Sequence, residues 1–272
     1  MSIERADECD RLIGRDHELR QLLISIDKRE SRLVWGAADS GTTALLSTAI
    51  SRLPRALRLR CATWTGAASG RELVSQLIAK VYLAGSEFLR KKVRADGERE
   101  NQLEPWLKKQ SALRLRGLLY SAVERGEYLI FLDHLAPATH HLAHFMKEIV
   151  YRCKTPIYLA ARGCTQKEIG FAWSLFWTDE LRIYLGPLSG ASAIQLLDHC
   201  ISKYELNKFD LTDFRKDVLR LSGHLPGSIV EMCRMAAEPQ YHYGDEIKTK
   251  LVHVDYLMRA EAARSWHSPV VQ

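Results

Sequence analysis

A pattern that could hold phosphate stands at residues 32–46, which read RLVWGAADSGTTALL. An apolar run leads into a loop bracketed by Gly36 and Gly41, and residues that favour a helix follow the loop. The spacing matches the phosphate-binding pattern G-x-x-x-x-G-K-[ST] at both glycines and at Thr43, the position of the metal-binding hydroxyl. The lysine position holds Thr42 instead. The functional interpretation therefore depends on whether this loop still binds a nucleotide.

The chemistry of such a loop comes mainly from its backbone. Successive N–H groups surround the phosphate oxygens, and the helix that follows directs its positive end at them. We expect the Thr43 hydroxyl to bind Mg²⁺ at the same place. The residues expected to line this cradle are Gly36, Ala37, Ala38, Asp39, Ser40, Gly41, Thr42 and Thr43.

Two further polar side chains stand where apolar runs end. Residues 127–134 read EYLIFLDH, which predicts a buried parallel strand that presents Asp133 at its carboxyl end. Arg162 ends a second apolar run at 156–162 in the same way. Ligands of parallel sheets bind at the carboxyl ends of the strands. The loop at 36–43, Asp133 and Arg162 are therefore expected at one edge of a sheet.

The elements that must position these residues alternate between strands and helices. Alternation of this kind predicts an α/β domain, with a five-stranded parallel sheet flanked by helices. The expected strands cover 33–35, 56–63, 127–133, 156–162 and 181–185, and the expected helices cover 16–28, the stretch from the loop to 53, 71–83, 111–125 and 139–151.

The strands stop after Pro187, and the chain then predicts helices only. Helices expected at 189–204, 211–221, 226–237 and 254–263 make an all-helical lid domain of residues 188–265, after an α/β domain of residues 1–187 and before a tail at 266–272. Within the first domain, residues 86–110 are highly charged with few apolar positions. This stretch is interpreted as a surface insertion with a solvated face, and contact with nucleic acid or a protein partner is the second interpretation.

The composition fits a soluble globular protein and excludes a membrane span. Hydrophobic residues make up 46% and charged residues 26% of the chain, and no apolar run approaches the about 18 residues that a bilayer requires. The first residues do not have the pattern of a signal peptide, so a cytoplasmic location is expected. Six scattered cysteines without a C-x-x-C pair are interpreted as free thiols. A net charge of +6 allows contact with nucleic acid without requiring it.

In the order and spacing of its motifs the chain resembles the AAA+ and STAND groups of P-loop ATPases. Residues 12–19 resemble the adenine-contacting box, 36–43 the Walker A motif and 129–133 the Walker B motif. Arg162 lies where STAND members carry an arginine that senses the γ-phosphate, and 221–229 resemble the lid element around Pro226. The combination is also similar to the ATPases that regulate DNA transposition and origin recognition.

The resemblance implies a bound ATP or ADP with Mg²⁺, placed between the sheet and the lid. Thr43 and Asp133 would then hold the Mg²⁺, and Ile13 and Arg15 would lie on the adenine side. Pro226 would contact the nucleotide from the lid, and Arg162 would report the γ-phosphate. Such a module would use the nucleotide to control self-assembly or the binding of a protein partner.

Three departures from the family pattern concern hydrolysis. Loss of the Walker A lysine at Thr42 removes a charged hydrogen bond of about 1.5–3 kcal/mol, which weakens ATP binding about ten- to a hundredfold. His134 replaces the acidic residue that usually follows the Walker B aspartate, and Gly227 replaces a sensing arginine of the lid. Asp39 adds a negative charge inside the loop. Binding with slow or no hydrolysis is the resulting expectation.

Two other functions stay open at this stage. The first is a pseudo-ATPase that serves as an interaction scaffold with an empty site. The second is an active ATPase that acts on DNA, with His134 or a residue of another subunit as the base and with duplex nucleic acid as the partner. A metal site at His140 and His144, which are one helical turn apart, is disfavoured because only Asp133 adds a nearby carboxylate.

Overall fold

The computed structural model describes residues 12–65, 70–97, 99, 102–134 and 137–265. The expected tail at 266–272 lies outside these residues. The chain divides into two compact units, which are described separately. Of the described residues, the first unit contains His17–Gly36 and those within 42–184, and the second contains Leu12–Asp16, Ala37–Gly41 and 185–265. In the described part of the chain, no helix has the length and apolar character that crossing a membrane requires.

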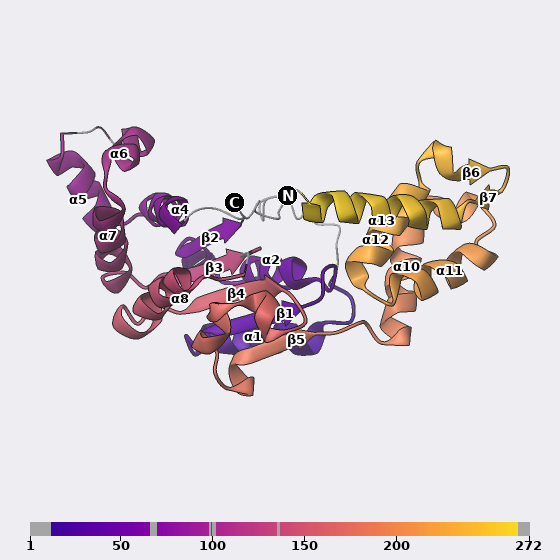
Figure 1. Cartoon of the computed structure of the whole chain (residues 1–272), viewed down its shortest axis with the longest axis horizontal. Helices are drawn as coiled ribbons and strands as arrows, with labels where there is room; N and C mark the ends of the chain where they lie inside the picture. Colours follow the sequence, from indigo (N-terminus) through magenta and orange to yellow (C-terminus); the bar gives the residue numbers. More distant parts are fainter. Residues whose placement is uncertain (1–11, 66–69, 98, 100–101, 135–136, 266–272) are drawn as a thin grey trace. The chain divides into compact units, whose positions relative to one another are not determined.

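The first unit is built on a five-stranded parallel sheet, as the sequence predicts (Figure 1). Its strand order is β2-β3-β4-β1-β5, so β1 lies between two strands that come much later in the chain. In β3 every residue is buried, as expected for a parallel strand covered on both faces. The five strands are β1 (Arg32–Gly36), β2 (Cys61–Thr65), β3 (Leu129–Asp133), β4 (Ile157–Arg162) and β5 (Arg182–Leu185).

The expected strand at 56–63 is wrong over its first half. Residues Arg55–Arg58 form the short helix α3, and β2 begins only at Cys61. Pro54 immediately precedes this helix, where its fixed φ and missing N–H are compatible with a helix start. Leucine and arginine alternate in this stretch as in a strand with one buried face, but the residues form a helical turn.

Helices flank the sheet and connect its strands (Figure 1). The phosphate-loop pattern leads directly from β1 into α2 (Thr42–Arg52), whose buried Leu45, Leu46 and Ala49 pack on the sheet. The other main helices of this unit are α1 (Asp16–Asp27), α4 (Gly70–Leu83), α7 (Ala112–Glu124) and α8 (His140–Lys147), with short helical turns at Glu148–Arg152, Gln166–Ile169, Phe171–Leu175 and Asp179–Leu181.

The charged stretch at 86–110 forms two helices, α5 (Glu87–Ala95) and α6 (Leu103–Lys109). Leu89, Val93, Trp106 and Leu107 of these helices are buried in the main core, and Phe88 and Leu103 are partly buried against it. Trp106 Nε1 also donates a 2.8 Å hydrogen bond to Asp96 Oδ2. The insertion is therefore packed on one side by a small number of apolar residues, and its charges lie on the other side.

The second unit is mainly helical and has its own core. The core is formed by apolar residues such as Leu197, Phe214 and Met232. A two-stranded antiparallel hairpin, β6 (His242–Tyr243) and β7 (Glu246–Ile247), is an addition that the sequence analysis did not include. The helices are α10 (Gly190–Lys203), α11 (Thr212–Ser222), α12 (Pro226–Ala236) and α13 (Thr249–Ser265), with short turns at Leu206–Lys208 and Pro239–Tyr241.

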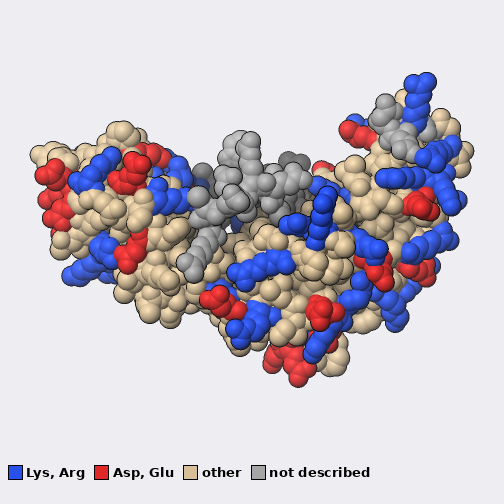
Figure 2. Space-filling model, turned by 180° about the vertical axis from the view of Figure 1, so that it is seen from behind, with Lys and Arg blue, Asp and Glu red and all other residues tan. Residues whose placement is uncertain are grey.

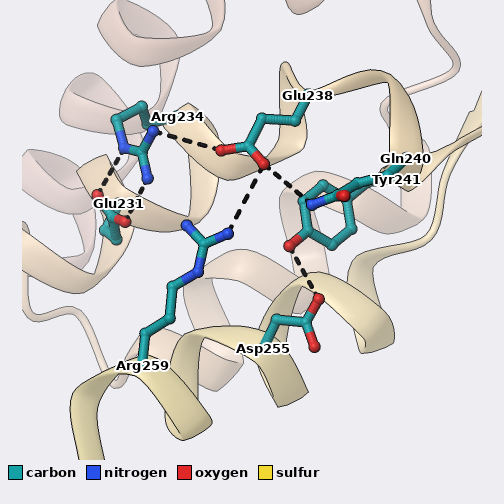
Figure 3. A network of polar contacts seen from close by, with 7 residues as sticks. All are labelled: Glu231, Arg234, Glu238, Gln240, Tyr241, Asp255 and Arg259. Atoms are coloured by element: carbon teal, nitrogen blue, oxygen red, sulfur yellow. Dashed lines mark hydrogen bonds and ion pairs between the residues drawn. The ribbon is translucent and has the colours of Figure 1, made fainter. Parts of the chain in front are cut away.

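A polar network fastens α13 to α12 and to the turn that follows α12 (Figure 3). The Tyr241 hydroxyl donates a 2.9 Å hydrogen bond to Asp255 on α13, and burial raises the pKa of Tyr241. Glu238 contacts arginines of both helices. The members are Glu231, Arg234, Glu238, Gln240, Tyr241, Asp255 and Arg259. The network holds the last helix in a fixed orientation on the second unit.

Candidate nucleotide site

The loop between β1 and α2 has a backbone that turns sharply. Asp39 and Gly41 have φ values of 65° and 93°, in the left-handed region that glycine adopts most readily. The hydroxyl of Ser40 is fully buried and has no hydrogen-bond partner among the residues that the structure describes. Thr42 is 4% exposed, so the side chain in the lysine position is packed into the protein. The loop therefore turns sharply at Asp39 and Gly41, and its role as a phosphate cradle stays a prediction.

Four polar side chains meet at the carboxyl ends of the strands in the first unit. Nε2 of His134 lies 3.2 Å from Thr43 Oγ1, 3.2 Å from Arg162 Nη2 and 3.4 Å from Asp133 Oδ2. Gly36 and Arg162 are register partners at the ends of β1 and β4, which explains why these elements bring their residues together. The structure thus assembles the predicted group of Thr43, Asp133 and Arg162, with the His134 ring at its centre.

Asp133 is the acid of this group, and it is deeply buried. It is 1% exposed, and its Oδ1 accepts a 2.9 Å hydrogen bond from the backbone N–H of His134. Its Oδ2 accepts no hydrogen bond from the described residues, since the His134 contact at 3.4 Å is too long and poorly directed to count as one. A buried carboxylate oxygen without a hydrogen bond is costly. Asp133 and Thr43 therefore fit a divalent cation, whose charge would satisfy that oxygen.

Arg15 supports the loop from within the second unit. It is 4% exposed, and its Nη2 donates to the carbonyl oxygens of Ser40, at 3.3 Å, and of Gly186. A buried guanidinium needs such acceptors to offset its loss of hydration. Ile13 is buried in the core of the same unit. Contact of Ile13 and Arg15 with an adenine ring stays a prediction.

The centre of the loop is held by helices α12 and α13 of the second unit. The carboxylate of Asp39 accepts hydrogen bonds from the hydroxyls of Tyr256, at 2.6 Å, and Ser228, at 3.3 Å. The Asp39 carbonyl accepts a 2.8 Å hydrogen bond from the N–H of Gly227. The loop and these helices all belong to the second unit. Sequence reasoning missed Ser228 and Tyr256, because no local pattern marks a hydroxyl that pairs with a distant acid.

The same contacts explain why position 227 is a glycine. A Cβ added there would lie 2.8 Å from Asp39 Cβ and 2.9 Å from Asp39 Cα, closer than real side chains approach. No arginine fits at this position in the structure, because any side chain would displace the loop. Pro226 starts α12, and its Cγ lies 3.5 Å from a Cβ built on Gly41.

The predicted residues thus fall into two groups, one in each unit. The first unit contains Gly36, Thr42, Thr43, Asp133, His134 and Arg162. The second unit contains Ile13, Arg15, Ala37, Ala38, Asp39, Ser40, Gly41 and Pro226. Within the described ranges, the candidate site included, no group of three or more His, Cys, Asp or Glu side chains is arranged to hold a metal ion, and His140 packs edge-on against Phe171.

Comparisons with known proteins agree with this architecture. No protein-family model matches the chain, and no curated protein matches it in sequence. Among solved structures it is similar to a Walker-type ATPase of Pyrococcus abyssi, with a TM-score of 0.58 and 16% identity over 96% of this chain and 76% of that one. It is also similar to the ORC1 protein of Aeropyrum pernix in complex with DNA, with a TM-score of 0.53 and 17% identity over 96% and 68% of the two chains.

These sequence identities are too low to transfer an activity. The structural similarity and the strand order of the sheet together establish the fold. The parallel five-stranded sheet is flanked by helices, as in a P-loop ATPase-like fold. The chain therefore has the fold of the AAA+ P-loop ATPases.

Proposed function

We propose that this protein is a regulatory nucleotide-binding module, which binds ATP or ADP with a divalent cation and hydrolyses ATP slowly or not at all. The observation that carries the proposal is Asp133. Its carboxylate is buried at the end of β3, His134 Nε2 lies close to both it and Thr43, and one of its oxygens lacks a hydrogen bond within the described structure. If no cation bound at this place, replacing the buried acid by a neutral residue would make the protein more stable.

The glycine loop supports the phosphate part of the proposal. Its left-handed residues and the start of α2 give the turn-then-helix arrangement on which phosphate binding depends. Arg162, at the end of β4, adds a positive charge at the same carboxyl edge of the sheet as Asp133. Mg²⁺ held by Thr43 and Asp133 would neutralise phosphate charge, and that is the chemistry which the cation supplies when bound.

Slow hydrolysis follows from the residues that replace the usual catalytic groups. Thr42 is short, neutral and buried, so it supplies no charge to the phosphates. His134 replaces the acidic residue that helps to activate water in the family pattern, and its Nε2 contacts Thr43 and Arg162. We therefore propose that the bound nucleotide acts as a regulatory ligand, which controls self-assembly or the binding of a protein partner.

A direct binding measurement tests the proposal. A fluorescent ATP analogue is titrated into the wild type, into Asp133→Asn and into the control Asp179→Asn, which changes an exposed acid of the same unit. The proposal expects saturable binding by the wild type and the control, and binding weakened at least about tenfold by Asp133→Asn. Absence of saturable binding up to millimolar ligand would favour the scaffold with an empty site. That alternative also expects Thr43→Ala and Asp133→Ala to leave partner binding unchanged.

A second candidate function, action on duplex DNA, is favoured by the distribution of charge. Lys and Arg side chains gather over the region of α5 to α7 (Figure 2). Some are paired, such as Arg114 with Asp96 at 2.6 Å, so the net attraction is smaller than the number of cations suggests. The cations on these helices are Arg90, Lys91, Lys92, Arg94, Lys108, Lys109, Arg114 and Arg116. The similar ORC1 structure contains DNA, which supports testing this partner first.

The test of this candidate is the salt dependence of duplex binding. Contact with the phosphate backbone of DNA predicts that the affinity for duplex falls steeply as the salt concentration rises. The double variant Lys91→Glu with Lys92→Glu should reduce both the affinity and the steepness of its dependence on salt. The matched control places the same charge change on the second unit, as Lys216→Glu with Lys250→Glu. DNA-stimulated phosphate release that Asp133→Ala abolishes would indicate an active ATPase, and turnover equal to buffer with and without DNA would exclude one.

A further inference from the structure

His134 has a backbone conformation that few residues other than glycine adopt. Its φ is 52°, and its N–H donates to the carboxylate of the preceding Asp133. Left-handed non-glycine residues are uncommon, and where the surrounding structure enforces them they often mark functional positions. The consequence here is geometric. The turn places the imidazole ring of His134 beside the carboxylate of Asp133, with Nε2 3.4 Å from Oδ2.

The partners of Nε2 show that it carries a lone pair. The guanidinium of Arg162 can only donate hydrogen bonds, and it lies 3.2 Å from Nε2. Nε2 therefore accepts in this arrangement, and the tautomer assigned from these partners has its proton on the other ring nitrogen. A neutral imidazole nitrogen with a free electron pair is the form that binds metal ions.

The spacing of the surrounding oxygens fits one shared cation. Ligand atoms about 2.0–2.2 Å from a single ion lie about 3.0–3.4 Å from one another in tetrahedral or octahedral geometry. Nε2 lies 3.2 Å from Thr43 Oγ1 and 3.4 Å from Asp133 Oδ2, within that range. Neither distance is short enough for a strong hydrogen bond. The group therefore combines one nitrogen, one carboxylate oxygen and one hydroxyl.

We infer that His134 is a ligand of the divalent cation at this site, and that it makes the site prefer Mn²⁺, Co²⁺ or Zn²⁺ over Mg²⁺. The inference rests on the proposed nucleotide binding, since phosphate oxygens must complete the ligand set. First-row transition-metal ions accept an imidazole ligand more readily than Mg²⁺ does, with Mn²⁺ the weakest of the three, because Mg²⁺ prefers oxygen ligands in octahedral geometry. Arg162 must leave Nε2 when the cation binds, and Arg162 is the exposed last residue of β4.

The experiment measures nucleotide affinity with each metal in turn. A fluorescent ATP analogue is titrated in Mg²⁺, Mn²⁺ or Co²⁺ with the wild type, His134→Asn, His134→Asp and the control His141→Asn, an exposed histidine on α8. Asn and Asp both tolerate the left-handed conformation, so these variants separate loss of the imidazole from loss of the turn.

The wild type and His141→Asn should bind at least about tenfold more tightly with Mn²⁺ or Co²⁺ than with Mg²⁺. His134→Asn should lose this preference, and His134→Asp should bind more tightly than the wild type with Mg²⁺. The visible absorption spectrum of Co²⁺ gives an independent readout, because it should change on adding nucleotide to the wild type and not to His134→Asn.

The outcomes separate this inference from the function on which it rests. Tight binding with Mg²⁺, equal affinities with the other ions and an unchanged His134→Asn variant would overturn the metal preference and leave nucleotide binding intact. Failure to bind nucleotide with any of the three ions would overturn both.

Discussion

The hydroxyl of Tyr256 donates a 2.6 Å hydrogen bond to the carboxylate of Asp39, a residue 217 positions earlier in the chain. Asp39 is the middle residue of the glycine-bracketed loop, and Tyr256 lies on α13, the last helix. Ser228 on α12 contacts the same carboxylate and also lies 2.8 Å from the Tyr256 hydroxyl. The negative charge of the glycine-bracketed loop therefore accepts hydrogen bonds from two hydroxyls, one on α12 and one on α13.

Neutralising Asp39 should strengthen nucleotide binding. Asp39→Asn keeps the shape and the left-handed backbone, and it removes one negative charge from the loop that faces the phosphates. A unit charge at short range in a partly solvated site changes affinity about three- to thirtyfold. Titration of a fluorescent ATP analogue measures the change.

Tyr256→Phe is the companion variant, and it should have the opposite effect. It leaves the Asp39 charge with one hydroxyl fewer, so nucleotide affinity should fall and the loop should become more open to proteolysis. If Asp39→Asn weakens binding instead, the carboxylate contributes to nucleotide binding and the charge argument is incorrect.

Restoring the lysine of the loop should also tighten binding. Thr42→Lys supplies the missing charge, and a charged hydrogen bond of about 1.5–3 kcal/mol corresponds to roughly ten- to a hundredfold in affinity. Thr42 is buried at the start of α2, so the longer side chain must extend over the loop. Ala44→Lys adds the same charge to an exposed position of the same helix and serves as the control. Equal affinity of the wild type and Thr42→Lys would mean that the loop does not form a cradle.

Much of the fold could be predicted from the sequence because its signals are local. Apolar runs at 33–35, 127–133 and 156–162 become β1, β3 and β4, and the carboxyl ends of parallel strands necessarily share an edge. That rule alone places Asp133 on the side of the sheet where Thr43 lies. The wrong start of the strand at 56–63 arose because alternating leucines and arginines also suit one helical turn.

The side-chain contacts of the site could not be predicted in the same way. The direction of the His134 ring depends on a left-handed backbone, which sequence reasoning has no means of assigning to a histidine. The pairing of Asp39 with Ser228 and Tyr256 depends on the docking of two distant helices. Gly227 was interpreted as the loss of an arginine, whereas in the structure it makes room for Asp39.

Asp96 should make the stability of the charged insertion depend on pH. The hydrogen bond from Trp106 is the main cause that lowers the pKa of Asp96 below its ordinary value of 3.8, and Arg114 adds to it. A lowered pKa in the folded state means that the ionised acid stabilises the fold above about pH 4, and that this contribution is lost as pH falls through the lowered value.

The wild type should therefore lose more stability than Asp96→Asn between pH 5 and pH 2, where other acids titrate equally in both proteins. Urea unfolding followed by tryptophan fluorescence at several pH values measures the difference. If the free energy of unfolding changes with pH by the same amount in both proteins, the hydrogen bond between Asp96 and Trp106 contributes nothing to folding.

Gly227→Ala should destabilise the protein and disturb the loop together. The added Cβ would lie within 3 Å of the Asp39 backbone, and relief requires the loop to move away from α12. Overpacking of this kind costs about 1–3 kcal/mol. Gly190→Ala is the matched control, because this glycine begins α10 in the same unit and nothing lies within 4 Å of its added Cβ. Thermal unfolding should show a lower midpoint for Gly227→Ala and an equal or higher one for Gly190→Ala. Equal midpoints for Gly227→Ala and the wild type would show that the loop and α12 are not in close contact in solution.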